Sequence, residues 1–368
     1  QERKKVNKAI TSIIDNGMYE LMKYKKLIAL AIIGSLVAAP ASAGWWKKAK
    51  KKAKKAVKEV VQVVDTVNDT LSDAALWVKG IEETAGETGY TKSGSLKYLP
   101  SQTPAADSGT LVVGTYNMTG LPQALGGIKP KDAKVISKML ESWNWDIGGI
   151  QEDWVVHEEL ISKLTTDTYP SRSRHYNGNP VLSFGDGLFS VAGFNSFDEK
   201  IHREKFKKCR GTLMDYFKGK EKNPDCNSEK GFTVAEVRIA SDLTIHFYNL
   251  HMSTGADEDV YQPQLQQIND SLNNRSKGIP VIMVGDFNMK YDRKESDDLQ
   301  SFVQNNQLTD SCFGVQADCG DRLDHMLFKG NDHWALTLIS ESLVSDGGAG
   351  PEGGHHPRQM TLGYERLN

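Results

Sequence analysis

The feature that most constrains the fold of this chain is the segment Pro280–Asn288, which reads Pro-Val-Ile-Met-Val-Gly-Asp-Phe-Asn. Apolar and β-branched residues bounded by proline and glycine predict a strand that is buried on both faces. The polar residues then come at the end of the strand, where the core opens to solvent. Asp286 and Asn288 are two residues apart, so in extended geometry both side chains point the same way. A carboxylate and an amide that point together suit a phosphate or its attacking water, whereas an Asx-type turn is the structural alternative.

Four further predicted strands run into polar residues of types that occur in catalytic sites. Taken singly, each has a structural explanation, because a carboxylate after a strand is often a helix cap and a lone histidine is often a hydrogen-bonded structural residue. Packing alone does not require so many of them. The polar ends are Asn117 after residues 111–116, Gln151-Glu152 after residues 147–150, His251 after residues 243–250, and Asp324-His325 after Arg322-Leu323.

Strands alternate with helices between residues 109 and 368, which predicts an α/β domain. Helical periodicity covers residues 131–143 and 262–274. The extended segments are residues 111–117, 146–151, 187–194, 232–239, 243–251, 280–286, 323–328 and 335–339. The catalytic domain is therefore expected over residues 109–368.

Residues 22–43 contain the three parts of a secretory signal, namely a basic start, an apolar run and a small-residue end. The apolar run, residues 27–39, has 13 residues, which is short for a bilayer span. We therefore predict a protein that is secreted or periplasmic after cleavage near Ala43, with an uncleaved anchor as the minor alternative. We predict no function for residues 1–21, so residues 1–43 are an upstream segment and signal peptide.

Residues 44–80 predict an amphipathic helix, because apolar residues recur with helical periodicity until Gly80. Eight lysines crowd its first third behind Trp45 and Trp46, a pattern that suits an anionic membrane surface. Nucleic-acid phosphate is the competing partner, and a solvated basic face is the structural alternative. Residues 81–108 lose the periodicity and are rich in Gly, Ser, Thr and Pro, so they predict a linker.

The net charge of −2 combines this basic segment with an acidic remainder, so it excludes no class of partner. Export favours disulfides for the four cysteines. The local pairings are Cys209 with Cys226 and Cys312 with Cys319. No Cys-x-x-Cys motif occurs, so a redox or zinc site has little support.

In its order of motifs, the chain resembles the endonuclease/exonuclease/phosphatase superfamily of metal-dependent phosphodiesterases. The resemblance covers about residues 109–368. Export, the cysteine-bounded loop before Lys230-Gly231-Phe232, and the phrase Tyr248-Asn249-Leu250-His251 are most similar to the secreted sphingomyelinase-type branch. The motifs are Asn117, Gln151-Glu152, Asn249-Leu250-His251, Gly285-Asp286-Phe287-Asn288, Arg322-Leu323-Asp324 and a late His-His-Pro.

This resemblance implies a four-layer α/β sandwich, in which two packed mixed β-sheets are flanked by helices and the amphipathic helix precedes them. Glu152, helped by Asn117, would hold Mg²⁺ or a similar cation such as Mn²⁺. Asp286 would orient or deprotonate the attacking water, and Asn288 would bind a phosphate oxygen. His251 and the late histidine would bracket the phosphate.

The end of the chain departs from the family's Ser-Asp-His-x-Pro pattern. Aligning the proline on Pro357 makes His355 the catalytic histidine, held by Asp324, and leaves His356 as a variable position near the substrate. Gly354 then occupies the place of the expected aspartate. Shifting the alignment by one residue makes His356 the catalytic histidine instead, but it does not restore the aspartate. Asp346, ahead of a glycine-rich stretch, is a candidate to fold back into the site.

Other histidines and tryptophans have no motif role, so we predict structural positions for them. A basic run around the first cysteine, Cys209, is either solvated or in contact with an anionic substrate. These residues are His246, His325, His333, Trp143, Trp145, Trp154, and the basic Lys205, Lys207, Lys208 and Arg210.

The expected activity is hydrolysis of a phosphodiester bond with a divalent metal ion. Sphingomyelin or another phospholipid at a membrane surface is the leading substrate, and DNA, as for a secreted DNase-like endonuclease, is the alternative. A further alternative is a non-catalytic membrane- or phosphate-binding relative that has lost the aspartate at position 354. No protein partner is inferred.

Overall fold

A computed structural model describes residues 105–121, 126–176, 185–194, 196, 201–211, 225–255, 257–315, 319, 321–350 and 354–368. The predicted signal, the lysine-rich helix and nearly all of the predicted linker lie outside the described residues. Among the helices that are described, none combines the length and the apolar character needed to cross a membrane.

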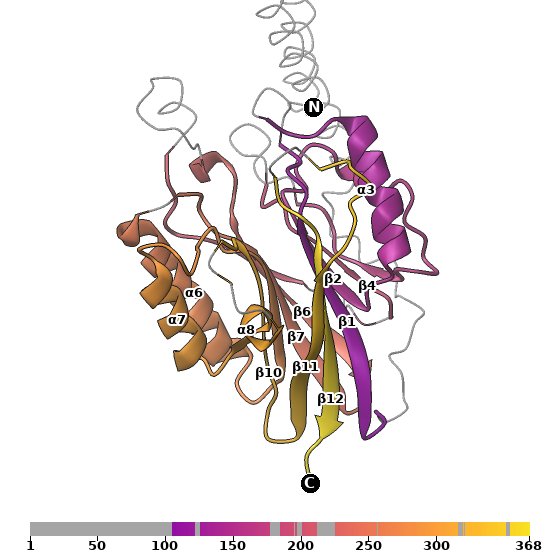
Figure 1. The fold of residues 1–368 in the computed structure, drawn as a ribbon, viewed down its shortest axis with the longest axis vertical. Helices are drawn as coiled ribbons and strands as arrows, with labels where there is room; N and C mark the ends of the chain where they lie inside the picture. The colour runs from indigo at the N-terminus through magenta and orange to yellow at the C-terminus, as the bar shows by residue number, and fades with distance from the viewer. Residues whose placement is uncertain are drawn as a thin grey trace, which may run out of the picture. The chain divides into compact units, whose positions relative to one another are not determined.

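Two mixed β-sheets of six strands each pack against one another (Figure 1). Sheet A has the strand order β11 (Trp334–Leu343), β12 (Arg358–Arg366), β1 (Ser108–Asn117), β2 (Ile147–Gln151), β4 (Phe189–Ala192) and β3 (Ser171–Arg172). Sheet B has the order β5 (His202–Lys205), β6 (Gly231–Ala240), β7 (Leu243–His251), β8 (Val281–Asp286), β10 (Asp324–Lys329) and β9 (Thr309–Asp310).

Helices cover the outer face of each sheet. Helix α3 (Pro130–Trp143) and the short α4 (His157–Ile161) pack on sheet A, and α6 (Glu258–Arg275) and α7 (Ser296–Asn305) pack on sheet B. Within the described residues, the remaining helical segments are the 3-10 turn η2 (Asp225–Asn227) and α8 (Ser311–Val315). The predicted four-layer α/β sandwich is therefore confirmed.

Three buried apolar clusters follow from this layering, one between the sheets and one under the helices on each side. Val113 and Ile147 of sheet A meet Phe247 and Val284 of sheet B in the central cluster. The outer clusters bury Ile136 and Leu140 of α3 under sheet A, and the α6 and α7 side chains under sheet B. Because strands in both sheets are covered on two faces, they read as continuous apolar runs.

The predicted organising strand is β8, and all of its residues, Val281–Asp286, are buried. It pairs in parallel with β7 and antiparallel with β10. Gly285 adopts φ of 147°, and a Cβ at this position would lie 2.0 Å from the Leu250 carbonyl oxygen. Only glycine allows this close approach of β8 to β7 next to Asp286.

The predicted elements differ from the observed ones mainly at their bounds. The predicted helix over residues 262–274 begins earlier, at Glu258, and the predicted strand over 335–339 extends to Leu343. Helix α7 is not among the predicted elements, and the pattern predicts no bounds for β12, whose residues alternate only weakly between apolar and polar. Both predicted disulfides, Cys209–Cys226 and Cys312–Cys319, are confirmed.

Candidate active site

Strand ends from both sheets meet at one end of the sandwich because neighbouring parallel strands end at the same edge. Asn117, at the end of β1, donates from Nδ2 to Glu152 Oε1 and to Asp286 Oδ2, at 2.9 Å each. Asn117 belongs to sheet A and Asp286 to sheet B, so these hydrogen bonds cross the interface between the sheets. One buried amide therefore holds two carboxylates together.

Glu152 follows β2 in a left-handed conformation with φ of 59°, and the Trp154 N–H donates back to its carbonyl oxygen at 3.0 Å. The carboxylate oxygen Oε2 is buried and has no hydrogen-bond partner among the described residues. Burial raises the pKa of Glu152, although the nearby Lys230 ammonium and the Asn117 amide oppose this effect. A buried carboxylate oxygen that lacks a donor is a suitable ligand for a hard cation.

Asp286 ends β8, and its Oδ1 accepts the backbone N–H of Asn288 at 2.8 Å. Asn288 has φ of 52° and donates from Nδ2 to the Met252 carbonyl oxygen at 2.9 Å. The extended geometry predicted through Asn288 is therefore wrong, because the chain turns as soon as β8 ends. Burial raises the pKa of Asp286 to about 6, with Asp324 acting in the same direction.

His251 ends β7 directly beside Asp286 in the parallel register. Its Nε2 lies 3.5 Å from Asp286 Oδ2 and 3.7 Å from Glu152 Oε1, and its ring stacks on Trp154 with centroids 5.8 Å apart. The side chain is fully buried. Burial lowers the pKa of His251 well below its usual value, and Lys230 adds to this effect. His251 is therefore a neutral imidazole at physiological pH.

His355 and Asp324 form a pair across the two sheets. The His355 Nδ1 donates to Asp324 Oδ2 at 2.7 Å, since a carboxylate can only accept. The other ring nitrogen, Nε2, lies 3.6 Å from Asp286 Oδ2. Burial lowers the pKa of His355, but Asp324 and Asp286 outweigh it and raise the pKa to about 10. His355 is therefore protonated at physiological pH.

The structure answers the question of register at the end of the chain. His355 meets Asp324, whereas His356 is exposed, and no contact with the carboxylates is described for it. Asp346 accepts the backbone N–H groups of Gly348 and Gly350. These contacts do not support the expectation that Asp346 folds back into the site, because its carboxylate caps its own glycine-rich turn.

Two further residues lie at the site, and sequence reasoning gave them no catalytic position. Lys230 is buried and its Nζ lies 3.0 Å from Asp225 Oδ1, and its charge reaches Glu152, His251 and Asp286. Trp154, predicted as core or rim, is the stacking partner of His251. The sequence signals were the phrase Lys230-Gly231-Phe232, which contributed to the family resemblance, and the position of Trp154 two residues after Glu152.

A pocket of about 290 Å³ adjoins the carboxylate cluster and shares Asn288 with it. Its walls combine basic, acidic and aromatic side chains from the start of α6 and the loop before α7. The lining residues are Ser253, Gly255, Tyr261, Asn288, Met289, Arg293, Lys294 and Glu295.

The donor set fits a hard divalent cation. Ligand atoms of Glu152, His251 and Asp286 lie within 4.8 Å of one another, as do those of Asp286, Asp324 and His355. The orphaned Oε2 of Glu152 provides a free ligand atom at this place. Asn117 presents its amide nitrogen to the carboxylates, while its oxygen accepts the Thr119 N–H at 3.0 Å. In this arrangement Asn117 orients the carboxylates, and an amide flip is needed before its oxygen could act as the predicted ligand.

A second cluster of possible ligands, Asp153, His157 and His175, lies directly behind Glu152. Its contacts are hydrogen bonds: His157 Nδ1 lies 2.5 Å from Asp153 Oδ2, and His175 Nε2 lies 2.7 Å from the Asp153 carbonyl oxygen. These separations are shorter than the roughly 3 Å that two ligands bound at about 2.0–2.1 Å keep around one ion. The cluster is therefore a hydrogen-bonded support for the Glu152 turn.

Comparisons with known proteins show the family of this chain. A model of the Endonuclease/Exonuclease/phosphatase family matches residues 114–346. Sphingomyelinases of Mycobacterium bovis and Mycobacterium tuberculosis are each 30% identical over 257 residues, which cover 66% of this chain and 47% of the relative. The chain thus spans about half the length of the curated relatives it matches.

Solved structures of low sequence identity are similar to this chain. A functionally unknown conserved protein from Enterococcus faecalis V583 has a TM-score of 0.50 at 13% identity, and the match covers 68% of this chain and 99% of that one. Sphingomyelinase C from Streptomyces griseocarneus has a TM-score of 0.45 at 14% identity, with 71% of this chain and 100% of that chain covered.

Proposed function

Since the chain belongs to the endonuclease/exonuclease/phosphatase family, we propose that it is a metal-dependent phosphodiesterase that cleaves the head-group ester of a phospholipid by in-line attack of water. The observation that carries the proposal is the pair of carboxylates, Glu152 and Asp286, held by one amide between two histidines. Hydrolysis of a phosphodiester requires that the negative charge of the phosphoryl group be neutralised, that a water molecule be oriented for in-line attack, and that the leaving oxygen be stabilised. This arrangement can supply all three.

Glu152 would hold the divalent cation, Mg²⁺ or Mn²⁺, with Asn117 as the group that orients it. When bound, the cation would neutralise charge on the phosphoryl oxygens. Lys230 lies close enough to add to the positive potential at the same place. Asn288 uses one Nδ2 hydrogen for the Met252 carbonyl, which leaves the other to bind a phosphate oxygen.

Asp286 would act as the general base that takes a proton from the attacking water. A pKa of about 6 suits this role, because the carboxylate is ionised at neutral pH and remains basic enough to accept a proton. His355, protonated and held by Asp324, would give its Nε2 proton to the leaving alkoxide as the phosphorus–oxygen bond breaks. Neutral His251 would donate a hydrogen bond to the phosphate without adding charge.

The lipid substrate rests on the similarity to proteins described as sphingomyelinases and on the predicted lysine-rich helix over residues 44–80. We propose export for the same protein, supported by the predicted signal and by two disulfides. The catalytic domain would comprise residues 109–368.

A second candidate substrate is nucleic acid, and the charge of the pocket beside Asn288 favours it. Arg293 and Lys294 line that pocket, and a neighbouring phosphate of a polynucleotide would be attracted there. Glu295 and Tyr261, which line the same pocket, suit a cationic head group such as choline instead.

The deciding experiment compares the mature protein on sphingomyelin liposomes and on plasmid DNA, each with Mg²⁺ and with EDTA, and with and without residues 44–80. Release of phosphocholine that stops with EDTA supports the proposal. Efficient nicking of DNA with no phosphocholine release would replace the lipid by nucleic acid, and metal-independent binding without turnover on either substrate would favour a non-catalytic protein.

The pocket provides a sharper variant of this experiment. Arg293→Glu reverses one charge in the pocket without touching the carboxylate cluster, and Lys294→Glu is not an equivalent change because Lys294 pairs with Asp257 at 3.0 Å. If the pocket takes a choline group, Arg293→Glu leaves or improves lipid turnover. If it takes a phosphate, DNA cleavage falls and the salt dependence of binding becomes weaker.

A further inference from the structure

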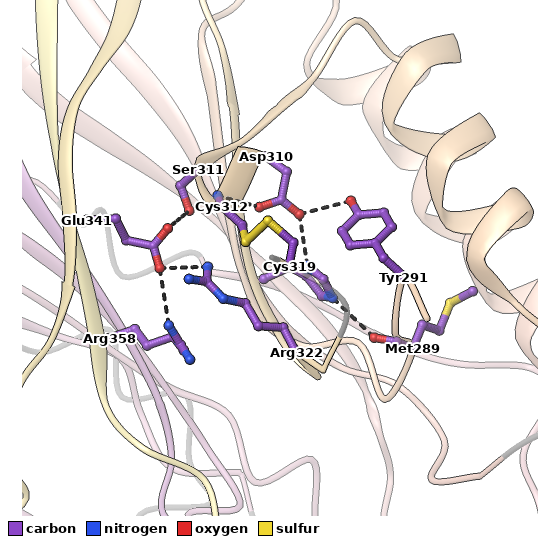
Figure 2. Close-up of a disulfide and its surroundings, with 10 residues drawn as sticks. Met289, Tyr291, Asp310, Ser311, Cys312, Cys319, Arg322, Glu341 and Arg358 are labelled. Atoms are coloured by element: carbon purple, nitrogen blue, oxygen red, sulfur yellow. Dashed lines mark hydrogen bonds and ion pairs between the residues drawn. A yellow bond between two sulfur atoms is a disulfide. The ribbon is translucent and has the colours of Figure 1, made fainter. Parts of the chain in front are cut away.

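Glu341, on β11, lies at the centre of a buried ionic cluster beside the Cys312–Cys319 disulfide (Figure 2). Its Oε1 lies 2.6 Å from Nη1 of Arg322 and 3.4 Å from Nη1 of Arg358, and its Oε2 accepts the Ser311 hydroxyl at 2.8 Å. The Glu341 side chain is 0% exposed. A fully buried carboxylate is tolerated at such a place only because its partners satisfy it.

The members of this cluster come from both sheets. Glu341 and Arg358 belong to β11 and β12 of sheet A, whereas Arg322 leads into β10 of sheet B and Ser311 begins α8 next to β9. Glu341 therefore joins the sheets with ionic contacts at the same end of the sandwich as the carboxylate cluster.

The two arginines also flank the pair that joins the sheets at the active site. Arg322 stands two residues before Asp324, and Arg358 stands three residues after His355. The Asp324–His355 hydrogen bond forms only if the start of β10 and the loop before β12 stand at the right separation. Convergence of both arginines on Glu341 fixes that separation.

The opposite side of the disulfide supports a different part of the site. His325 lies between Asp310 Oδ2, at 2.8 Å, and the Met289 carbonyl oxygen, at 3.1 Å, and Asp310 also accepts the Tyr291 hydroxyl at 2.9 Å. This second network holds the loop that follows Asn288. It explains the burial of His325 and confirms its predicted structural position.

We infer that Glu341 is a positioning residue, which sets the distance between Asp324 and His355 through the two arginines and so aligns the acid that protonates the leaving group. The alternative is an ionic contact that contributes stability alone. Arg366 provides the comparison, since it lies on the same strand β12 and joins it to Asp242 of the β6–β7 turn at the far end of the sandwich. The inference rests on the proposed phosphodiesterase function where kcat is measured. Its structural test measures the His355–Asp324 hydrogen bond and does not depend on that function.

The test uses Arg358→Gln, with Arg358→Lys as the conservative variant and Arg366→Gln as the matched control. Glu341→Gln would leave two guanidinium groups sharing a neutral partner and can fail to fold, whereas Arg358→Gln keeps the Arg322–Glu341 pair. Each variant is purified as the full mature chain. Steady-state kinetics of phosphocholine release from sphingomyelin with Mg²⁺ are used because the leaving alkoxide of this substrate needs a proton. They are combined with proton NMR of the His355 Nδ1–H, assigned by its loss in His355→Ala.

Arg358→Gln is expected to lower kcat by roughly 10- to 100-fold, the effect of a small misplacement of a catalytic group. KM and the Mg²⁺ concentration for half-maximal activity stay unchanged, because Glu152 and Asn288 are held by other contacts. The hydrogen-bonded His355 resonance weakens or disappears, and Arg358→Lys restores part of both signals.

Equal loss of melting temperature in Arg358→Gln and Arg366→Gln, with unchanged kcat and an unchanged His355 resonance in both, would overturn the inference. Absence of turnover by the wild-type protein on every phosphodiester would refute the proposed function instead. In that case the His355 resonance alone still decides whether Arg358 and Glu341 hold the pair.

Discussion

Replacing Glu152 with glutamine is expected to stabilise the metal-free protein while it removes binding of the cation. Burial raises the pKa of Glu152, which means that the folded protein favours the neutral form of this group. Glutamine is neutral and nearly isosteric, and its Oε1 can still accept the Asn117 Nδ2–H that now goes to Glu152. The substitution therefore removes a charge and keeps the hydrogen bond.

The magnitude follows from the spacing of the carboxylates. Ligand atoms of Glu152 and Asp286 lie within 4.8 Å, and two like charges at about this distance repel by about 3 kcal/mol at an effective dielectric constant of about 20. At pH 8 Asp286 is ionised, because its pKa is about 6, and its charge opposes ionisation of Glu152. Lys230 and His355 offset part of the repulsion, so we expect a gain of about 1–2 kcal/mol in unfolding free energy.

Binding of the divalent cation is expected to make the wild type more stable than Glu152→Gln. At about 100 times its dissociation constant, a ligand that binds only the folded state stabilises it by about 2.7 kcal/mol, which for a domain of this size raises Tm by roughly 5–10 °C. Thermal melts at pH 8 with EDTA and with increasing Mg²⁺ or Mn²⁺ measure both effects. Wild type should melt below Glu152→Gln in EDTA and above it in saturating cation.

An equal rise of Tm with Mg²⁺ in wild type and in Glu152→Gln would refute this reasoning, since the cation would then bind elsewhere. A lower Tm for Glu152→Gln in EDTA would also contradict it. Asp321→Asn is a suitable control, because it removes an exposed carboxylate that pairs with Lys290 on the surface.

Two further predictions concern the histidines and the pH dependence. His251→Ala should lower kcat by roughly 100- to 10,000-fold, whereas His333→Ala, an exposed position before β11, should leave kcat unchanged; similar rates for both variants would remove His251 from the mechanism. The rate should fall as the pH drops through about 6, where Asp286 gains a proton, and a cation that stabilises the carboxylate would move this limb to lower pH. The rate should fall again as the pH rises through about 10, where His355 loses its proton. Asp324→Asn removes a charge that raises the pKa of His355, so the alkaline limb of the pH–rate profile should move to lower pH, and an unmoved limb would assign it to another group.

The family and the fold could be predicted from the sequence because they depend on local order. A buried strand ending in Gly-Asp-x-Asn, further strands ending in polar residues, and their sequence along the chain indicated the endonuclease/exonuclease/phosphatase family, and the match over residues 114–346 confirms it. A continuous apolar run predicts a strand that is covered on both faces, because a position that is buried in the fold favours an apolar residue. The disulfide pairings were also local, with separations of 17 and 7 residues.

The site itself depends on contacts that no local pattern encodes. The Asn117–Asp286 hydrogen bond joins residues 169 positions apart, and the Asp324–His355 bond joins the start of β10 to the loop before β12. Asp346 shows the limit most clearly, because its position before the glycine-rich stretch suggested a catalytic partner, whereas its backbone contacts make it a turn cap.

The sequence by itself therefore determined which residue types stand at the ends of which strands, because strand formation and burial follow from neighbouring residues. Only the tertiary structure decided which of these residues meet. The stacking of Trp154 on His251, the left-handed turn at Glu152 and the convergence of two arginines on Glu341 arise where the two sheets pack together. Packing of one sheet on the other sets these distances, and it depends on side chains throughout both interfaces.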